Sequence, residues 1–92
     1  MADLNGMVVF AAVARAQSFT AAARLLGMPK STVSQRVAAL EGRLGVKLLH
    51  RTTRKVRLTD TGAAYADRCL RLLAEATEAD REATQQGAEL RG

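Results

Sequence analysis

Aromatic residues are scarce in this chain of 92 residues, which contains two Phe, one Tyr and no Trp. Alanine occupies eighteen positions, and 48% of the residues are hydrophobic. Small side chains let helices pack closely, whereas a sandwich of sheets usually needs larger β-forming residues. The length fits one domain with a small core. The composition therefore predicts a single, mainly α-helical domain.

Cysteine and long apolar runs are also nearly absent. Cys69 is the only cysteine, so no internal disulfide can form and an intracellular chain is favoured. No apolar stretch approaches the ~20 residues that a membrane helix needs. We expect a soluble, cytoplasmic protein that makes no membrane contact.

The sequence contains no combination of residues that is typical of an enzyme active site. His50 is the only histidine, and neither a carboxylate pair nor a glycine-rich phosphate loop is present. The sequence therefore predicts no enzymatic activity, no metal site and no cofactor. His50 is interpreted as a strand residue, with a role beside a phosphate as the alternative.

Charge is unevenly distributed along the chain. Residues 1–59 contain ten Lys or Arg against two acids, and residues 60–92 contain four Arg against seven acids, for a net charge of +5. A cationic body suggests a polyanionic partner, and simple solvation of the surface is the alternative.

Apolar spacing predicts two helices in the first part of the chain. Asp3 can cap a helix over about residues 4–16, and Ser18 or Thr20 can cap a shorter one that ends at Gly27. The first is expected to bury Leu4, Met7, Phe10, Ala11 and Ala14, and the second Phe19, Ala22, Ala23 and Leu26.

A third helix follows a tight corner at Gly27 to Pro29 and can end at Gly45. Its apolar stripe is Val33, Val37, Leu40 and Leu44. Ser31, Gln35 and Ala38 lie on the opposite side, and Thr32 and Ser34 flank them. Arg36 and Lys30 lie nearer the boundaries with the core.

The polar side of this helix lacks the Glu and Lys that usually fill a solvated face. Ser, Thr and Gln are short or carry an amide, and they can hydrogen-bond to base edges in a major groove. The alternative is that Ser31 and Thr32 serve the helix N-terminus while Ser34 and Gln35 are ordinary surface residues.

Two short apolar segments around Leu48 and around residues 56–58 flank "RTTRK", which predicts a hairpin with a basic tip. The hairpin would place Arg51, Arg54, Lys55 and Arg57 near phosphates or the minor groove. The predicted fold is a winged helix-turn-helix of three helices and a small hairpin, over residues 1–59, with its third helix in the major groove.

A long linker helix is predicted over about residues 60–86, capped by Thr59 and broken at Gly87. One heptad seam along it comprises Tyr65, Cys69, Leu72, Ala76, Ala79 and Ala83, and a second stripe comprises Ala66, Leu70 and Leu73. Two apolar stripes indicate two surfaces to bury, so we expect residues 60–92 to mediate dimerisation.

The segment "SFTAAARLLGMPKSTVSQRVAALEGRLGVKLLHRTTRKVRLTDTG" closely resembles the DNA-binding domain of LysR-type transcriptional regulators. The matching positions are Ala22, Ala23, Leu26, Ser34, Val37, Leu40, Glu41, Leu44, Gly45, Leu48 and Arg51. Pro29 departs from the usual Ser cap, and Leu49 replaces the usual Phe.

This resemblance implies a bacterial transcription regulator that binds operator DNA as a homodimer through paired linker helices, and often as a tetramer. It also implies a C-terminal effector domain, which this sequence does not include, so we expect a DNA-binding fragment. By position it implies DNA contacts from Lys30, Ser31, Ser34, Gln35, Arg36, Arg51 and Arg54.

Two alternatives stay open. A non-specific architectural or RNA-binding protein suits the basic body, although few aromatic side chains are available to stack on bases. A protein-interaction module built on the acidic helix suits the heptad seam.

Overall fold

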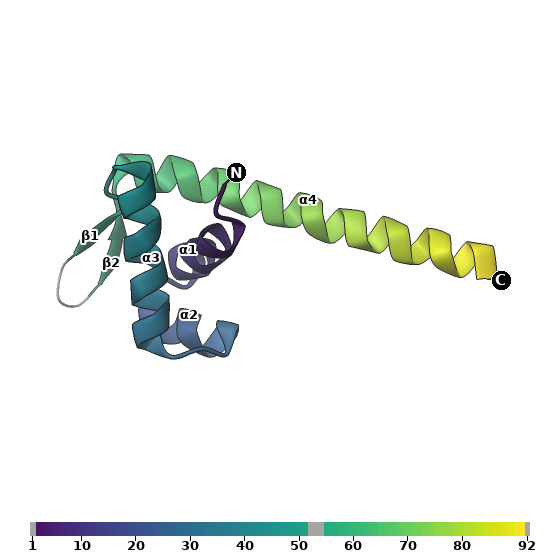
Figure 1. The fold of residues 1–92 in the computed structure, drawn as a ribbon, viewed down its shortest axis with the longest axis horizontal. Coiled ribbons are helices and arrows are strands. Elements are labelled where there is room, and N and C mark those ends of the chain that lie inside the picture. The colour runs from purple at the N-terminus through teal and green to yellow at the C-terminus, as the bar shows by residue number, and fades with distance from the viewer. Residues whose placement is uncertain (1, 52–54, 92) are drawn as a thin grey trace.

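Residues 2–51 and 55–91 are described by a computed structural model, which contains four helices and one hairpin. The elements are α1 (Leu4–Ala16), α2 (Phe19–Leu26), α3 (Lys30–Leu44), β1 (Leu49–Arg51), β2 (Val56–Leu58) and α4 (Asp60–Arg91). A body made of α1, α2, α3 and the hairpin packs against the first part of α4 (Figure 1). The rest of α4 projects alone, and the molecule extends 54 × 24 × 19 Å. This architecture confirms the predicted mainly helical fold with a hairpin.

Side-chain caps begin three of the helices where the sequence predicts them. The backbone N–H of Gly6 donates to Asp3 Oδ1 at 3.0 Å, and that of Ala21 donates to Ser18 Oγ at 3.0 Å. The N–H of Gly62 donates to Thr59 Oγ1 at 2.8 Å at the start of α4. Each cap satisfies a donor that the first helical turn leaves unpaired.

Glycines with positive φ end α2 and α3. Gly27 has φ +65° and Gly45 has φ +70°, in the left-handed region where a Cβ would be strained. The turn at Gly27 leads directly into α3, so α2 and α3 meet at a sharp corner (Figure 1). This corner holds the exposed side of α3 away from the body.

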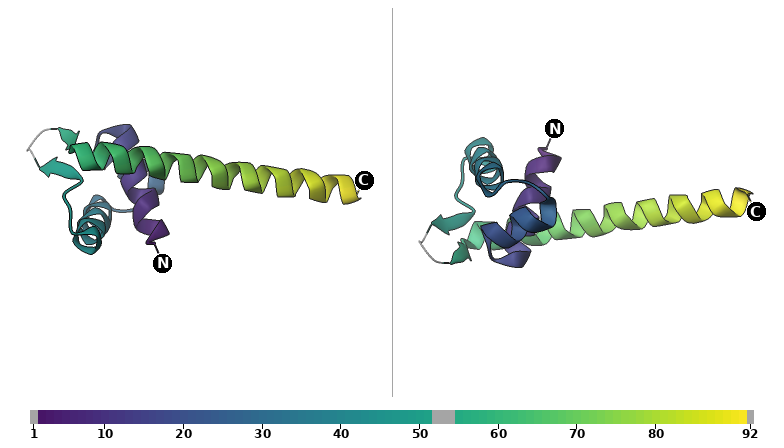
Figure 2. Two further views of the ribbon diagram at one scale, coloured as in Figure 1. Left: turned by 90° about the horizontal axis from the view of Figure 1, so that it is seen from above. Right: turned by 90° about the horizontal axis from the view of Figure 1, so that it is seen from below.

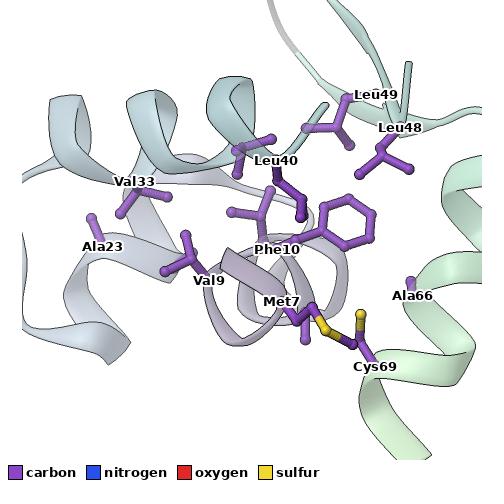
Figure 3. Close-up of a cluster of buried hydrophobic side chains, with 14 residues drawn as sticks. Met7, Val9, Phe10, Ala23, Val33, Leu40, Leu48, Leu49, Ala66 and Cys69 are labelled. Atoms are coloured by element: carbon purple, nitrogen blue, oxygen red, sulfur yellow. The ribbon is translucent and has the colours of Figure 1, made fainter. Parts of the chain in front are cut away.

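The core lies where α1 is enclosed by the other elements. Phe10 of α1 is completely buried and lies beside Leu40 of α3 and Leu48, which precedes β1 (Figure 3). On the same face of α1, one turn before Phe10, Met7 points toward Cys69 of α4 (Figure 3). The first part of α4 is therefore a component of the core.

Several burial predictions for α1 and α3 need correction. Val9 and Val13 are buried although they lie off the predicted face, because α2, α3 and α4 all pack against α1. Leu4 is 59% exposed because it begins α1, at the edge of the core. Leu44 is 39% exposed because it is the last residue of α3, beyond the part of the helix that the core covers.

The hairpin alternates between an inner and an outer face. Leu49 pairs with Leu58, and His50 pairs with Arg57, in an antiparallel register. Leu49 is buried, whereas His50 and Arg57 are exposed. Successive strand residues point to opposite faces, so the basic pair faces solvent.

The predicted end of the last helix at Gly87 is wrong, because α4 continues to Arg91. A glycine inside a helix costs only about 1 kcal/mol relative to alanine, and the residues after it are good helix formers. At 32 residues, α4 spans about 48 Å. No helix in the described part of the chain is long and apolar enough to cross a membrane.

Candidate nucleic-acid interface

Helix α3 has one side in the core and one side in solvent. Val33, Val37 and Leu40 are at most 1% exposed. Ser31 and Gln35 lie opposite them and are exposed, with no part of the body covering them. The packing of the apolar stripe thus presents a row of short polar side chains outward.

Ser31 and Thr32 are the second and third residues of α3, so they do lie at its N-terminus, but neither of them caps it. The N-cap residue is Pro29, which makes no side-chain cap, and its carbonyl accepts from the N–H groups of Thr32 at 3.0 Å and Val33 at 3.2 Å. Neither Ser31 nor Thr32 is the cap, so capping does not account for the hydroxyl group of Ser31.

The predicted DNA-contacting residues fall into three groups. Those that are exposed are Lys30, Ser31, Gln35, Arg36 and Lys55. Thr32 and Ser34 are half-buried. Arg51 is the last residue of β1, with a side chain outside the described part, and Arg54 lies outside the described residues altogether.

A small depression joins the start of α3 to the hairpin. Its volume is about 190 Å³, and its lining includes Lys30 and Ser34 from α3 and Lys55 from the hairpin. Phe19, Leu49, His50 and Val56 complete it. The fold therefore brings together two predicted cationic residues, 25 positions apart in the sequence, beside the exposed side of α3.

Glu41 has a structural role that was not predicted from the sequence. It is 6% exposed, and its Oε2 accepts from the backbone N–H of Leu48 at 2.8 Å and of Leu49 at 3.2 Å. The carboxylate thereby attaches the first strand of the hairpin to α3. The sequence did offer one sign of this role, because Glu41 is the only acidic residue in α3 and lies toward its core side.

The predicted dimerisation seam is divided between two environments. Cys69 is 1% exposed in the core, and the ring of half-buried Tyr65 lies 5.8 Å from that of Phe10, centroid to centroid. Burial raises the pKa of the Cys69 thiol and, as the largest cause, that of the Tyr65 hydroxyl. The rest of the seam, namely Leu72, Ala76, Ala79 and Ala83, is exposed.

A larger apolar groove runs between the body and the projecting part of α4. Its volume is about 740 Å³. It is lined by Val8, Ala11, Ala12, Arg15 and Ala16 of α1, Leu25 and Leu26 of α2, and Leu70, Leu73, Ala74 and Thr77 of α4. Leu25 is 75% exposed. Leu26, which the sequence predicted on the buried side of this helix, packs against the core.

The groove and the exposed seam lie on different sides of α4. At about 100° per residue, the groove residues of α4 centre roughly 160° from Leu72 and Ala79. The second stripe supplies the groove through Leu70 and Leu73, which are half-buried. The projecting helix consequently offers two distinct apolar surfaces.

Among the described residues, no group of three or more His, Cys, Asp and Glu could hold a metal ion. Every buried side-chain nitrogen or oxygen in that part has a hydrogen-bond partner. The surface features that stand out are thus the polar side of α3, the cations beside it and the apolar groove.

Comparison with known proteins gives a consistent result. Residues 4–63 match the family model described as "Bacterial regulatory helix-turn-helix protein, lysR family". A transcriptional repressor of Pseudomonas aeruginosa strain UCBPP-PA14 is 52% identical over 87 residues, which are 95% of this chain and 27% of that protein. The transcriptional activator AaeR of Escherichia coli K12 is 51% identical over 75 residues, 82% of this chain and 24% of that protein.

Solved structures resemble the whole fold. The BenM DNA-binding domain in complex with catB site 1 DNA superposes with a TM-score of 0.86 at 30% identity, over 91% of this chain and 93% of that one. The CbnR DNA-binding domain in its DNA complex gives 0.81 at 30% identity, over 94% and 99%. The chain spans about a quarter of the length of the curated relatives it matches.

Proposed function

The chain belongs to the bacterial regulatory helix-turn-helix proteins of the lysR family, and from this membership we propose that it binds duplex DNA sequence-specifically to regulate transcription. Residues 1–59 form the DNA-binding unit, and residues 60–92 hold two copies together. Its relatives are named as transcriptional regulators, which supports a regulatory role and not an enzymatic one.

The exposed side of α3 is the observation that carries this proposal. A major groove is about 12 Å wide and admits one helix, provided that the inserted face is short and polar. Ser31, Ser34 and Gln35 provide such a face, and the buried stripe on the other side anchors it. Gln35 is the residue best suited to read a base, since its amide can pair with adenine N6 and N7.

The cations around α3 supply affinity rather than specificity. Lys30, Arg36 and Lys55 are exposed beside the polar face, and they contact phosphates on either side of the groove. Arg51 and Arg54 contribute from the hairpin to the backbone or minor groove. Thr32, half-buried at the start of α3, hydrogen-bonds to the same backbone.

Selection from a randomised duplex library at about 150 mM salt tests sequence specificity, because non-specific phosphate attraction is weak there. We expect an enriched inverted repeat. If no sequence is enriched and the affinity decreases steadily as the salt concentration rises, specific recognition is contradicted. Stronger binding to single strands than to duplex would favour an RNA-binding or architectural protein.

Two substitutions separate base contacts from phosphate contacts. Gln35→Ala should cost about 1–3 kcal/mol on the selected site and little on random DNA. Lys55→Ala should weaken binding to both and lower the salt slope by about one unit. Equal losses on target and random DNA for Gln35→Ala would remove that residue from the base-reading face.

The groove beside α4 is the surface that best supports a homodimer. A projecting helix with an apolar face buries that face only against something outside its own domain. The α4 helix of a second copy carries the same apolar stripe of Leu70, Leu73 and Ala74, so in the dimer the two helices lie together across the two grooves. The exposed seam from Leu72 to Ala83 remains a prediction for a second contact.

Paired glutamate substitutions at exposed positions discriminate between the two surfaces. Leu25→Glu and Thr77→Glu place a charge in the groove, whereas Leu72→Glu and Ala79→Glu place one on the seam. Sedimentation should show that the groove variants weaken the dimer by roughly 30-fold or more, the effect expected of a central contact. Dissociation by the seam variants alone would move the interface to the seam, and a monomeric parent would exclude both surfaces.

A further inference from the structure

The peptide groups around Leu48 are held from two sides by two different helices. The N–H of Leu48 donates to Glu41 of α3 at 2.8 Å, and its carbonyl accepts from the N–H of Thr59, just before α4, at 3.0 Å. The Leu48 side chain is completely buried between them. One residue thus links the helix that faces outward to the helix that projects from the body.

On the α3 side, the contact is made by a buried charge. Glu41 is the one charged side chain that is buried among the residues whose burial is described. Its Oε2 also accepts from Leu49, so two consecutive N–H groups converge on one carboxylate oxygen. Charge-assisted hydrogen bonds are shorter, stronger and more directional than apolar packing, so they hold β1 at a defined angle to α3.

On the α4 side, the contact leaves almost no free space. Thr59 Oγ1 donates to the carbonyl of Lys47 at 2.7 Å while it accepts from Gly62 at 2.8 Å. Gly62 is buried against the carbonyl of Leu48, where an added Cβ would overlap with that oxygen. The first turn of α4 can therefore approach this strand only without a side chain at position 62.

A second connection between α3 and α4 runs through α1, which packs against both. That connection consists of apolar side chains, among them Phe10 and Met7 (Figure 3). Apolar packing is not directional and tolerates small rotations, whereas hydrogen bonds weaken steeply with angle. The contacts to Leu48 are thus the directional part of the connection between α3 and α4.

We propose that Glu41, Leu48, Thr59 and Gly62, here called the Leu48 clamp, determine which spacing between two DNA half-sites the protein accepts. The inference rests on the proposed dimeric DNA binding. In such a dimer each α3 is carried on its own α4, so the angle between them sets the distance and rotation between the two α3 helices. Each base pair of spacer rotates a half-site by about 35°, so small changes of angle alter the preferred spacing.

The central experiment measures binding to two copies of the selected half-site, as an inverted repeat with spacers that increase one base pair at a time. The parent should show one sharp optimum, because a spacer that prevents the second contact loses much of the roughly 10²- to 10⁴-fold gain from bivalent binding. Glu41→Ala should flatten this profile until neighbouring spacers agree within about tenfold. Any loss of affinity for an isolated half-site, through the hairpin that Glu41 attaches to α3, should be the same at every spacer and should leave the shape of the profile unaffected.

Milder and matched variants keep the test decisive where Glu41→Ala does not fold. Thr59→Val removes both hydroxyl contacts, and Glu41→Gln removes the charge while it keeps an acceptor. Both should flatten the profile less than Glu41→Ala does. Glu75→Gln, at an exposed position of α4, is the control and should retain the sharp optimum. Folded Glu41 and Thr59 variants that also retain it would overturn the proposal.

A measurement without DNA separates this inference from the proposed function. Spin labels at Ala39→Cys on α3 and Gln85→Cys on α4, in a Cys69→Ala background, report the distance between the two helices. Labelled chains are diluted with unlabelled chains so that each dimer has one labelled copy. Glu41→Ala should broaden the distance distribution and Glu75→Gln should not. An unchanged distribution would contradict the clamp, whereas a parent that selects no half-site would contradict only the proposed function.

Discussion

The body and the outer part of α4 (residues 74–90) are both helical, but only the body contains the partners that its helices need. In the body, α1 is enclosed by α2, α3 and the start of α4, and Phe10 and Val13 have no exposed surface. In the outer part of α4 every residue is exposed except half-buried Gly87 (Figure 2). Isolated helices of this length are marginal in water. The body is thus stabilised by its own packing, whereas the outer helix, as described, is supported only by its connection to the body.

Charge separates the same two regions. The body carries the exposed cations Lys30, Arg36 and Arg57, whereas the outer part of α4 carries five acids and only Arg81 as a base. Ion pairs on that helix, such as Arg81 with Glu78 at 4.0 Å, are exposed and contribute little to stability. A basic body attracts a polyanion, and an acidic extension is kept away from it.

The largest expected contrast is between a core residue of the body and an apolar residue of the outer helix. Phe10→Ala should lower the free energy of unfolding by about 3–5 kcal/mol, since it removes a ring at the centre of the core. Leu90→Ala, at a residue that is 89% exposed, should change it by less than about 0.5 kcal/mol. Chemical denaturation measures both. Similar losses would mean that the outer helix is buried in solution.

Substitution of two glycines of α4 by alanine should change the stability of the protein in opposite directions. Gly62→Ala forces a methyl group against the Leu48 carbonyl and should destabilise the protein by about 1–3 kcal/mol. Gly87→Ala meets no atom within 4 Å and should stabilise the helix by up to about 1 kcal/mol. Thermal unfolding followed by circular dichroism tests the pair, and stabilisation by both would show that the start of α4 packs less tightly than described.

Loss of a side-chain hydrogen bond should also destabilise the protein more in the body than in the outer part of α4. Ser18→Ala removes the cap of α2 and should cost about 1 kcal/mol. Thr77→Ala removes an exposed bond from Thr77 Oγ1 to the Leu73 carbonyl at 3.0 Å, and should be neutral or slightly stabilising because alanine is the better helix former. Urea midpoints compare the two variants, and an equal loss for Thr77→Ala would show that its hydrogen bond to the Leu73 carbonyl stabilises the helix as much as the cap of α2 does.

The smallest expected effect is a change in pH dependence at the junction of the two regions. Burial raises the pKa of Cys69 above 9.0 in the folded protein. The folded state therefore holds this proton more tightly than the unfolded state, so stability is unaffected below the ordinary pKa and falls as the pH rises above it. Unfolding measured between pH 8 and pH 11 should show a shallower decline for Cys69→Ala. Identical slopes would mean that the thiol is accessible.

Local features of the fold were predictable because their causes are local. Caps at Asp3 and Thr59 and the left-handed ends at Gly27 and Gly45 depend on residues within one turn of the helix. The same holds for the outward face of α3, since the 3.6-residue period places Gln35 opposite the apolar stripe. Membership of the family, confirmed over residues 4–63, was likewise visible in those patterns.

Other features were predicted wrongly or not predicted, because they depend on residues that are distant in the sequence. The seam on α4 is periodic throughout, yet Cys69 packs in the core while Leu72 is exposed, because the body covers only the first part of the helix. Gly87 was expected to break a helix that its neighbours continue. The groove at Leu25 and the contacts of Glu41 with Leu48 depend on how separate elements meet.

By itself, the sequence determined the helices, the ends of all but α4, the hairpin and the polar face of α3, since these depend on propensity, capping and period. Only the tertiary structure decided which apolar residues of α4 belong to the core and which remain exposed. It alone placed Lys30 and Lys55 around one depression and joined α3 to α4 through Leu48. The physical reason is that burial and backbone hydrogen bonding between elements depend on their packing angles, which short-range patterns do not specify.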